Sequence, residues 1–218
     1  MQIYKIFRRF INYYQKKGFL KTVSRIFEQF YRILFKSKTV LFFADMSEVD
    51  NSKLKLPQDI VIEYKESFNQ ALQSDMKKMI NYWEDIMEMD RARERFEKGA
   101  ILWIIKSKAD IAGFGWSIRG KMVSPYHLPI TPNDVVLFDF FTFEEYRGHG
   151  FYALLLENIK GKMKLEGVSR VYGHSYEWNR SSIHGLEKGN MHKFIVTRKF
   201  HFWGRNITIW SYVNSSYR

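Results

Sequence analysis

The chain has 218 residues, of which 45% are hydrophobic and 17% aromatic, and a formal net charge of +12. This composition is too apolar for a disordered chain, and the length suits one domain with an appendage or two small domains. The absence of cysteine excludes a disulfide scaffold, thiolate metal sites and a cysteine nucleophile, and it fits a cytoplasmic protein.

The positive charge is concentrated at the N-terminus. Residues 1–38 carry ten Lys or Arg against one acidic residue, Glu28, which gives +9 and leaves +3 for the other residues. No apolar run approaches the roughly 18 residues that span a bilayer, and no signal-peptide pattern is present. Apolar side chains recur at helical spacing on both sides of Gly18, so the sequence predicts an arm of two basic amphipathic helices.

Three interpretations of this arm are open. Its apolar stripes could dock on the body of the protein or on the second subunit of a homodimer. Alternatively, the arm could lie on an anionic membrane surface, which would place a cytoplasmic protein peripherally on the inner membrane face. Nucleic acid is the least favoured partner, because residues 39–218 are nearly balanced in charge, and we expect none to bind.

Residues 39–218 are expected to form one domain in which strands and helices are mixed. Strands are predicted at 60–64, 101–106, 111–118, 135–141, 170–176, 194–200 and 207–213, with a hairpin across residues 108–110, and residues 39–43 form a short β-prone stretch. Helices are predicted at 69–82, 88–98, 150–165 and 180–188, with connecting loops at 46–58 and 119–134. This order predicts an α/β (α+β) sandwich with one mixed central sheet of about six to seven strands flanked by helices.

The segment VVLFDFFTFEEYRGHGFY at 135–152 is the most informative of the chain. Its first half reads as a strand buried on both faces, and its second half enters a helix through Arg147, Gly148, His149 and Gly150. Glycines at such a junction leave backbone N–H groups uncovered, and the helix N-terminus and an arginine add positive charge. The pattern therefore indicates a receptor for phosphate or pyrophosphate, although a plain glycine-rich turn would read the same way. A dinucleotide-binding motif is excluded because no G-x-G-x-x-G is present, and a P-loop is excluded because no Gly-Lys-Ser/Thr follows.

This segment resembles the acetyl-coenzyme A loop of the GNAT superfamily of N-acetyltransferases. The signature of that loop is Arg or Gln, two residues, Gly, one residue, then Gly or Ala, and the chain matches it at Arg147 and Gly150. The last position is Tyr152, a departure that crowds the start of the helix but leaves its backbone N–H available.

A second match lies downstream. The family commonly has Asn-x-x-Ser followed by a helix that ends in Glu-Lys near a glycine, which corresponds here to Asn179 and Ser182, then Glu187 and Lys188. Many members place a Tyr seven residues after the Asn to protonate the departing thiolate, but this chain has Leu186 there.

The resemblance implies that acetyl-CoA binds as co-substrate in a gap where the sheet splays, and that no metal is required. It implies that backbone near the strand end holds the pantetheine arm, that amides of the loop hold the pyrophosphate, and that the downstream motif contacts pantetheine or phosphate. The implied cofactor-binding residues are Phe141, Thr142, Arg147, Gly148, His149, Gly150, Phe151, Tyr152, Asn179, Ser182 and Lys188.

Amine acetylation needs a base for the acceptor ammonium and an acid for the thiolate. Asp139 is the only ionisable residue within the apolar run 135–141, and its burial there would strengthen it as a base; it could equally be a structural carboxylate. His174 on the adjacent predicted strand is the second candidate base. Tyr176, or else His184, would have to replace the missing acid.

The sequence specifies the acceptor poorly. Tyr126 and His127 in the proline-rich loop, the charged helix at 88–98, and Glu177 with Trp178 could line its pocket. Aromatic residues beside polar groups suit a sugar ring, so an amino-sugar or nucleotide-linked amino-sugar of surface-glycan assembly is the expected small-molecule amine. The alternative is a non-catalytic GNAT-like module that binds acyl-CoA, or nothing, and attaches to a membrane or partner through its basic arm.

Overall fold

The structure is a computed structural model of the whole chain. It describes residues 38–50, 56–72, 76–85, 88–121, 130–202 and 205–213, together with positions 11, 14–15, 18–24 and 27. The side chains at 199–202 and 205–207 are outside this description.

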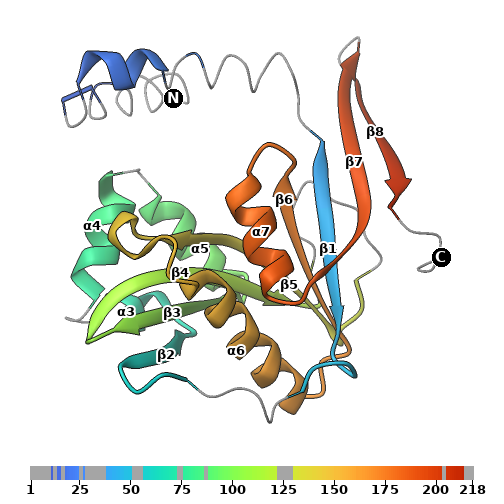
Figure 1. Cartoon of the computed structure of the whole chain (residues 1–218), viewed down its shortest axis with the longest axis horizontal. Helices are drawn as coiled ribbons and strands as arrows, with labels where there is room; N and C mark the ends of the chain where they lie inside the picture. The colour runs from blue at the N-terminus through green and yellow to red at the C-terminus, as the bar shows by residue number, and fades with distance from the viewer. Residues whose placement is uncertain are drawn as a thin grey trace.

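Eight strands form one sheet in the order β2-β3-β4-β5-β6-β1-β7-β8 (Figure 1). Their bounds are β1 Thr39–Asp45, β2 Ile60–Lys65, β3 Ile101–Ser107, β4 Asp110–Arg119, β5 Asp134–Thr142, β6 Arg170–Tyr176, β7 His192–Phe202 and β8 Arg205–Tyr212. All neighbours pair antiparallel except β5 and β6, which are parallel. The predicted mixed sheet is confirmed.

Helices cover both faces of this sheet. Their bounds are α3 Phe68–Ala71, α4 Lys77–Asp85, α5 Met89–Glu97, the 3-10 turn η3 Glu144–Tyr146, α6 Phe151–Leu165 and α7 Arg180–Lys188. Successive side chains of β3 point to opposite faces of the sheet and so belong to two separate cores. Leu102 and Ile104 pack with α3–α5, whereas Trp103 and Ile105 pack with α6. Figure 1 shows α3–α5 gathered beside β2–β4, and α6 and α7 on the opposite face.

Strand β1 raises the strand count above the predicted six or seven. It lies between β6 and β7 and is antiparallel to both, with Leu41 opposite His174 on one side and Ile195 on the other. Val40 and Phe42 are buried in the α6–α7 core and Leu41 in the opposite one. Such burial on both faces is what a central strand requires.

The sheet splays between β5 and β6. The two strands pair only from Asp134 to Val136 against 170–172, although β5 continues to Thr142 and β6 to Tyr176. Fully buried Asp134 locks the closed end, because its carboxylate accepts hydrogen bonds from Arg170 Nε (3.0 Å) and Thr131 N (2.8 Å). Beyond this lock the strands separate, as the sequence resemblance implied.

Other predicted elements differ in detail. The hairpin between β3 and β4 turns at Lys108 and Ala109, both with positive φ, as its spacing predicted. The single helix predicted at 69–82 is wrong, because α3 ends at Ala71 and α4 begins at Lys77. Residues 122–129, half of the predicted loop at 119–134, lie outside the described residues.

The N-terminal arm is described only in part. Gly18 has φ +80° between helical positions 14–15 and 19–24, which confirms the predicted break. Most other residues of the arm, and with them most of its two apolar stripes, lie outside the description. Among the described residues, no helix has both the length and the hydropathy of a membrane span.

Candidate active site

The chain leaves β5 through η3 and then makes a short glycine loop (residues 147–150) before α6. Gly148 and Gly150 have φ values of +82° and +81°, a conformation that L side chains rarely adopt. Gly150 is the N-cap of α6, with no side chain to cap the first turn. The helix N-terminus therefore presents backbone N–H groups and the positive end of its dipole to any anion placed there.

A lysine from α7 lies close to this helix start. The Nζ atom of Lys188 is 3.7 Å from the position that a Cβ on Gly150 would occupy. Arg147 contributes differently, because its Nε donates to the carbonyl of Thr142 (3.2 Å) and its guanidinium lies 5.9 Å from the centre of the Phe141 ring. Lys188 thus supplies the cation next to the loop, while Arg147 is tied to the end of β5.

Helix α7 begins at the second motif. The Asn179 side chain caps the helix by accepting from the backbone N–H of Ser182 (3.3 Å) and from the hydroxyl of Ser181 (3.0 Å). Gly189 ends the helix, and Asn190 adopts φ +51° just beyond it. Asn179 therefore orients α7, a role that its place at a helix start accounts for.

A cavity of about 740 Å³ opens between β5, α6 and α7, and we call it the interhelical cavity. It brings together ten of the eleven residues expected to bind acetyl-CoA: Phe141, Thr142, Arg147, Gly148, Gly150, Phe151, Tyr152, Asn179, Ser182 and Lys188. His149 is the exception, since it does not line the cavity and its Nδ1 lies 3.0 Å from the carbonyl oxygen of Arg147.

The cavity also has walls that the sequence reasoning missed. Ser181, His184 and Gly185 line it beside the expected Lys188, all on one face of α7. Their spacing of i, i+3, i+4 and i+7 was the available signal, because it defines one side of a helix. Of these, His184 had been considered only as a substitute acid, whereas the structure places it in the cavity wall.

Tyr152 fills the space between the two helices. Its ring lies 5.1 Å from that of Phe140, and a Cβ on Gly185 would lie only 2.6 Å from Tyr152 Cδ1. Its hydroxyl is 3.5 Å from that of Ser182, and burial raises the pKa of Tyr152 to about 12. The bulky residue in the signature is therefore accommodated by a glycine on the facing helix.

The burial expected for Asp139 is wrong. A register shift between β4 and β5 places Asp139 at a bulge with φ +49°, where its side chain is 55% exposed. The carboxylate forms an ion pair with Arg95 of α5, whose guanidinium also lies over the Trp116 ring (5.2 Å). Asp139 thus faces the α5 side of the gap as an exposed, paired carboxylate.

His174 and Tyr176 also face the α3–α5 side and do not line the interhelical cavity. Their neighbour Tyr172 on the same face of β6 belongs to the core packed under α3–α5. Tyr176 is half exposed and stacks on Trp178, with ring centres 5.5 Å apart and planes 10° from parallel. His174 is partly buried. These residues flank the gap from the side opposite the glycine loop.

Leu186, at the position where many GNAT proteins have the proton-donating Tyr, is part of the hydrophobic core. Leu186 is 2% exposed, and its Cδ2 lies 3.2 Å from where a Cβ on Gly173 would be. A proton donor must therefore come from another residue. Within the described part of the chain, no group of three or more His, Asp or Glu side chains is arranged to hold a metal ion.

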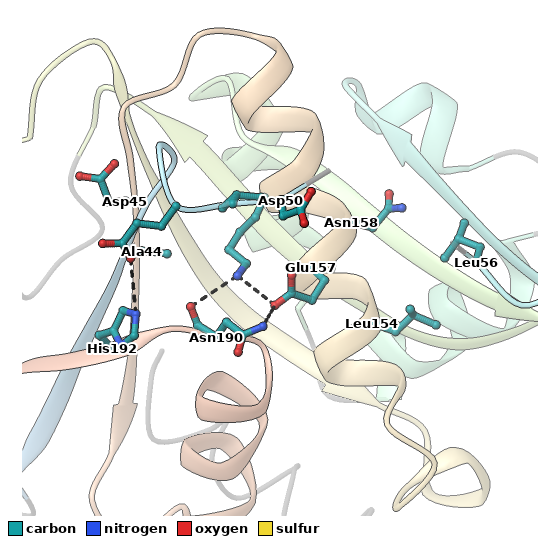
Figure 2. Close-up of a pocket in the computed structure, with 12 residues that line it drawn as sticks. Ala44, Asp45, Asp50, Leu56, Leu154, Glu157, Asn158, Asn190 and His192 are labelled. Carbon is teal, nitrogen blue, oxygen red and sulfur yellow. Dashed lines mark hydrogen bonds and ion pairs between the residues drawn. The ribbon is translucent and has the colours of Figure 1, made fainter. Parts of the chain in front are cut away.

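A second hollow, of about 430 Å³, lies farther along α6 and shares no residue with the interhelical cavity (Figure 2). Buried Lys160 donates to Glu157 (2.9 Å), which also accepts from the side-chain amide of Asn190 (3.0 Å). These polar groups are hydrogen-bonded to one another and connect α6 to Asn190, just beyond the end of α7. We therefore interpret the second hollow as a structural contact between the two helices.

Comparisons with solved structures show the fold. A functionally unknown conserved protein from Staphylococcus epidermidis has 11% sequence identity and a TM-score of 0.50, with 72% of this chain and 57% of that chain covered. An acetyltransferase from the GNAT family from Colwellia psychrerythraea has 9% identity and a TM-score of 0.50, with 72% and 53% covered. The chain thus spans a little over half the length of these solved chains.

No curated protein sequence is similar enough to this chain to count as a match. The sequence model of the acetyltransferase (GNAT) family, however, matches residues 60–189, which is more than half of the chain. This range begins at β2 and ends at the C-cap of α7, so it contains the glycine loop and both walls of the interhelical cavity. The chain therefore belongs to the GNAT acetyltransferase family.

Proposed function

We propose that this protein transfers an acetyl group from acetyl-CoA to a primary amine by direct nucleophilic attack. One observation carries the proposal: the splayed strands, the glycine loop and Lys188 converge on a single cavity. Its volume of about 740 Å³ suits a ligand of coenzyme size, and its start at a helix N-terminus suits a pyrophosphate.

In this proposal the chain binds acetyl-CoA mainly through backbone groups. Amides from Arg147 to Tyr152 hold the pyrophosphate, and Lys188 adds a charge beside them. The edge of β5 at Phe141 and Thr142 is unpaired with β6, so the pantetheine arm can approach its backbone, where the Thr142 carbonyl already accepts from Arg147 Nε. When bound, acetyl-CoA supplies the acetyl group as an activated thioester.

The acceptor would enter from the α5 side. Its ammonium must lose a proton before the nitrogen forms a bond to the acetyl carbon, and the thiolate released as the C–S bond breaks must gain one. We propose Asp139 for the first task because its exposed carboxylate lies at the bulge beside the gap, held by Arg95. His174 is the second candidate base, and Tyr176 and His184 are the candidate proton donors.

The acceptor that we propose is an amino-sugar or a nucleotide-linked amino-sugar. The support is the exposed, stacked pair Tyr176 and Trp178, which ends β6 at the rim of the gap. Stacked aromatic rings offer a flat apolar platform, and Glu177 between them in sequence adds a hydrogen-bond acceptor. A panel of amines tested as co-substrates, with amino-sugars against polyamines and peptides of equal concentration, decides this choice by the rate of free thiol release.

We further propose that residues 1–38 attach the domain at 39–218 to anionic membrane surfaces. Tyr14 and Phe19 are 52% and 67% exposed, and basic residues flank them in the sequence. A well-placed Lys or Arg gains about 1 kcal/mol near anionic lipid, and salt screens this gain. The protein should therefore sediment with anionic vesicles at low salt and be released at high salt.

A matched variant separates this proposal from docking on the body or on a second copy. Replacement of Lys16, Lys17, Lys21 and Arg25 by Gln keeps the apolar stripes but removes four charges. Loss of vesicle binding with an unchanged melting temperature and unchanged mass in solution supports the anchor. Unchanged vesicle binding rejects it. A truncation of residues 1–38 that aggregates or dimerises differently supports docking instead.

The alternative function is a non-catalytic module that binds acyl-CoA or nothing. Leu186 favours it, because the usual proton donor is missing from the core position. Thermal unfolding with added acetyl-CoA tests ligand binding: a ligand at about 100 times its Kd adds about 2.7 kcal/mol of stability. No shift at millimolar acetyl-CoA contradicts the enzyme proposal, and a shift without thiol release in any amine panel supports the non-catalytic module.

A further inference from the structure

A single lysine joins α4 to the segment that leads into the glycine loop. Lys78 Nζ donates to Asp110 Oδ2 (2.7 Å) and to the carbonyl of Ile111 (3.1 Å), and it forms an ion pair with Glu145 Oε1 (2.8 Å). Asp110 and Ile111 belong to the start of β4, whereas Glu145 belongs to η3. Three elements that are far apart in the sequence therefore meet at one ammonium group.

Aromatic rings complete this cluster. Lys78 Nζ lies 4.6 Å from the centre of the Phe143 ring and 4.9 Å from that of Tyr146. The Tyr146 hydroxyl donates to Asp110 Oδ2 (2.8 Å), and Tyr146 is also part of the wall of the interhelical cavity. The cluster thus reaches the proposed acetyl-CoA site through Tyr146.

The interactions of the cluster reinforce one another. Burial alone would lower the pKa of Lys78, but the hydrogen bonds that it donates to Asp110 and Glu145 outweigh burial, so its pKa is raised. The Lys78 ion pair lowers the pKa of Glu145. Exposed ion pairs add little to stability individually, and networks that share a charge over aromatic faces add more. The side chain of Lys78 is 28% exposed, so solvent screens the cluster only in part.

The cluster holds η3, and the glycine loop (residues 147–150) follows η3 directly in the chain. η3 is a single turn, and Gly148 and Gly150 add little backbone restraint of their own. When a loop samples other conformations, its apparent affinity falls in proportion as the fraction of time in the binding-competent conformation falls. Restraint from outside the loop is therefore what fixes the amides before a ligand arrives.

We infer that Lys78 is a positioning residue that holds η3, and through it the glycine loop, in the arrangement that binds acyl-CoA. This inference rests on the proposed function for its ligand. The role is separate from catalysis, because Lys78 acts through Glu145 and Tyr146. A lysine that merely stabilises the fold would instead leave the exchange of the loop unchanged relative to the rest of the protein.

The first experiment needs no ligand. Amide hydrogen exchange compares the full-length protein with Lys78→Met, which keeps an apolar side chain under the rings, and with Lys77→Met, an exposed neighbour on the same helix. We expect residues 143–152 to exchange about tenfold faster in Lys78→Met only. Equal exchange of this segment in all three proteins overturns the inference, and so does acceleration spread evenly over the whole sheet.

The second experiment measures acetyl-CoA affinity by calorimetry on the same proteins. We expect Kd to rise about tenfold in Lys78→Met, threefold in Tyr146→Phe and not at all in Lys77→Met. Where turnover is measurable, KM for acetyl-CoA rises and kcat is kept. An unchanged Kd in Lys78→Met overturns the inference while leaving the proposed function intact. Absence of binding by the parent protein overturns the proposed function, and hydrogen exchange then still decides whether Lys78 holds the loop.

Discussion

The two sides of the β5–β6 gap are built in different ways. On the α6–α7 side, the chain presents backbone amides, two glycines with positive φ and a lysine around one cavity. On the α5 side, Asp139 and Arg95 form an ion pair, and Tyr176 stacks on Trp178. The first side depends on backbone conformation within one short segment, whereas the second depends on side chains from separate elements.

Under the proposed function, the α6–α7 side would hold the co-substrate that the family shares, and the α5 side would hold the acceptor of the individual protein. A backbone receptor for a shared co-substrate needs glycines at fixed positions, so it leaves a motif. A side-chain surface for an acceptor can be rebuilt at each position without disturbing the sheet. Mutations should therefore act separately on the two sides. The first two predictions test that separation, and the two smaller ones test contacts that support the glycine-loop side.

The largest effect is expected in the glycine loop. Gly150→Pro should abolish acetyl-CoA binding, because proline is held near φ −65° and Gly150 has φ +81°. Gly148→Val should weaken binding by at least about tenfold, since left-handed backbone costs an L side chain about 1–2 kcal/mol. Calorimetry measures both effects.

Gly167→Val is the matched control for Gly148→Val. Both glycines have positive φ, and neither Cβ would meet another atom within 4 Å, but Gly167 lies beyond the far end of α6. The control should lose similar stability and keep its affinity. Equal affinity in Gly148→Val and the parent protein would mean that the pyrophosphate does not bind at this loop.

The next effect is on turnover alone. Asp139→Asn should lower kcat by about 10²–10⁴-fold if Asp139 takes the acceptor's proton, while acetyl-CoA affinity is unchanged. Arg95→Gln removes the ion pair that holds Asp139. We expect it to lower kcat by less than Asp139→Asn does. Full activity of Asp139→Asn would transfer the role of base to His174.

A smaller effect concerns the packing of Tyr152 against α7. Gly185→Ala places a Cβ 2.6 Å from Tyr152 Cδ1, and such overpacking costs about 1–3 kcal/mol. In a Tyr152→Ala background the same change should instead stabilise the protein by up to about 1 kcal/mol, because alanine favours a helix over glycine. Urea unfolding of the four proteins measures the sign, and destabilisation in both backgrounds would reject the contact.

The smallest effect is the pH dependence of the Lys78 cluster. The pKa of Asp110 is lowered because hydrogen bonds from Lys78 and Tyr146 outweigh its burial, and the pKa of Glu145 is lowered mainly by its hydrogen bond from Lys78. Their contribution is thus present above the ordinary values of 3.8 and 4.5 and is lost as the pH falls below them.

The difference in unfolding free energy between the parent and Lys78→Met measures this contribution. Both carboxylates are about half exposed, so we expect at most about 1 kcal/mol at pH 7 and a decline to near zero at low pH. If this difference in unfolding free energy instead grew as the pH fell, the proposed ion pairs of Lys78 with Asp110 and Glu145 would be contradicted.

The sequence predicted the parts of this molecule that depend on neighbouring residues. The glycine loop and the hairpin turn at Lys108 both follow from local backbone preferences. The sequence did not place β1 at the centre of the sheet, because a run such as 39–45 carries no record of which strands it joins. It misjudged Asp139 because the bulge that turns this residue outward arises from pairing with β4.

The Lys78 cluster and the ion pair of Asp139 with Arg95 were missed for the same reason. Lys78 is one of two adjacent lysines on α4, and its sequence neighbours do not distinguish it from Lys77. Only the folded sheet brings Asp110 and Glu145 to it. The need for glycine at position 185 likewise arises from Tyr152 on another helix, whose ring occupies the space that a Cβ would take.

The central claim is that acetyl-CoA binds through the amides at the start of α6. Amide NMR of the nitrogen-15-labelled protein during titration with coenzyme A tests this claim most directly. We predict that the signals of residues 147–152 and of Lys188 shift first and saturate together, while those of Glu157 and Asn190 in the second hollow stay in place. Saturable shifts confined to the second hollow, or none at millimolar coenzyme A, would contradict the account.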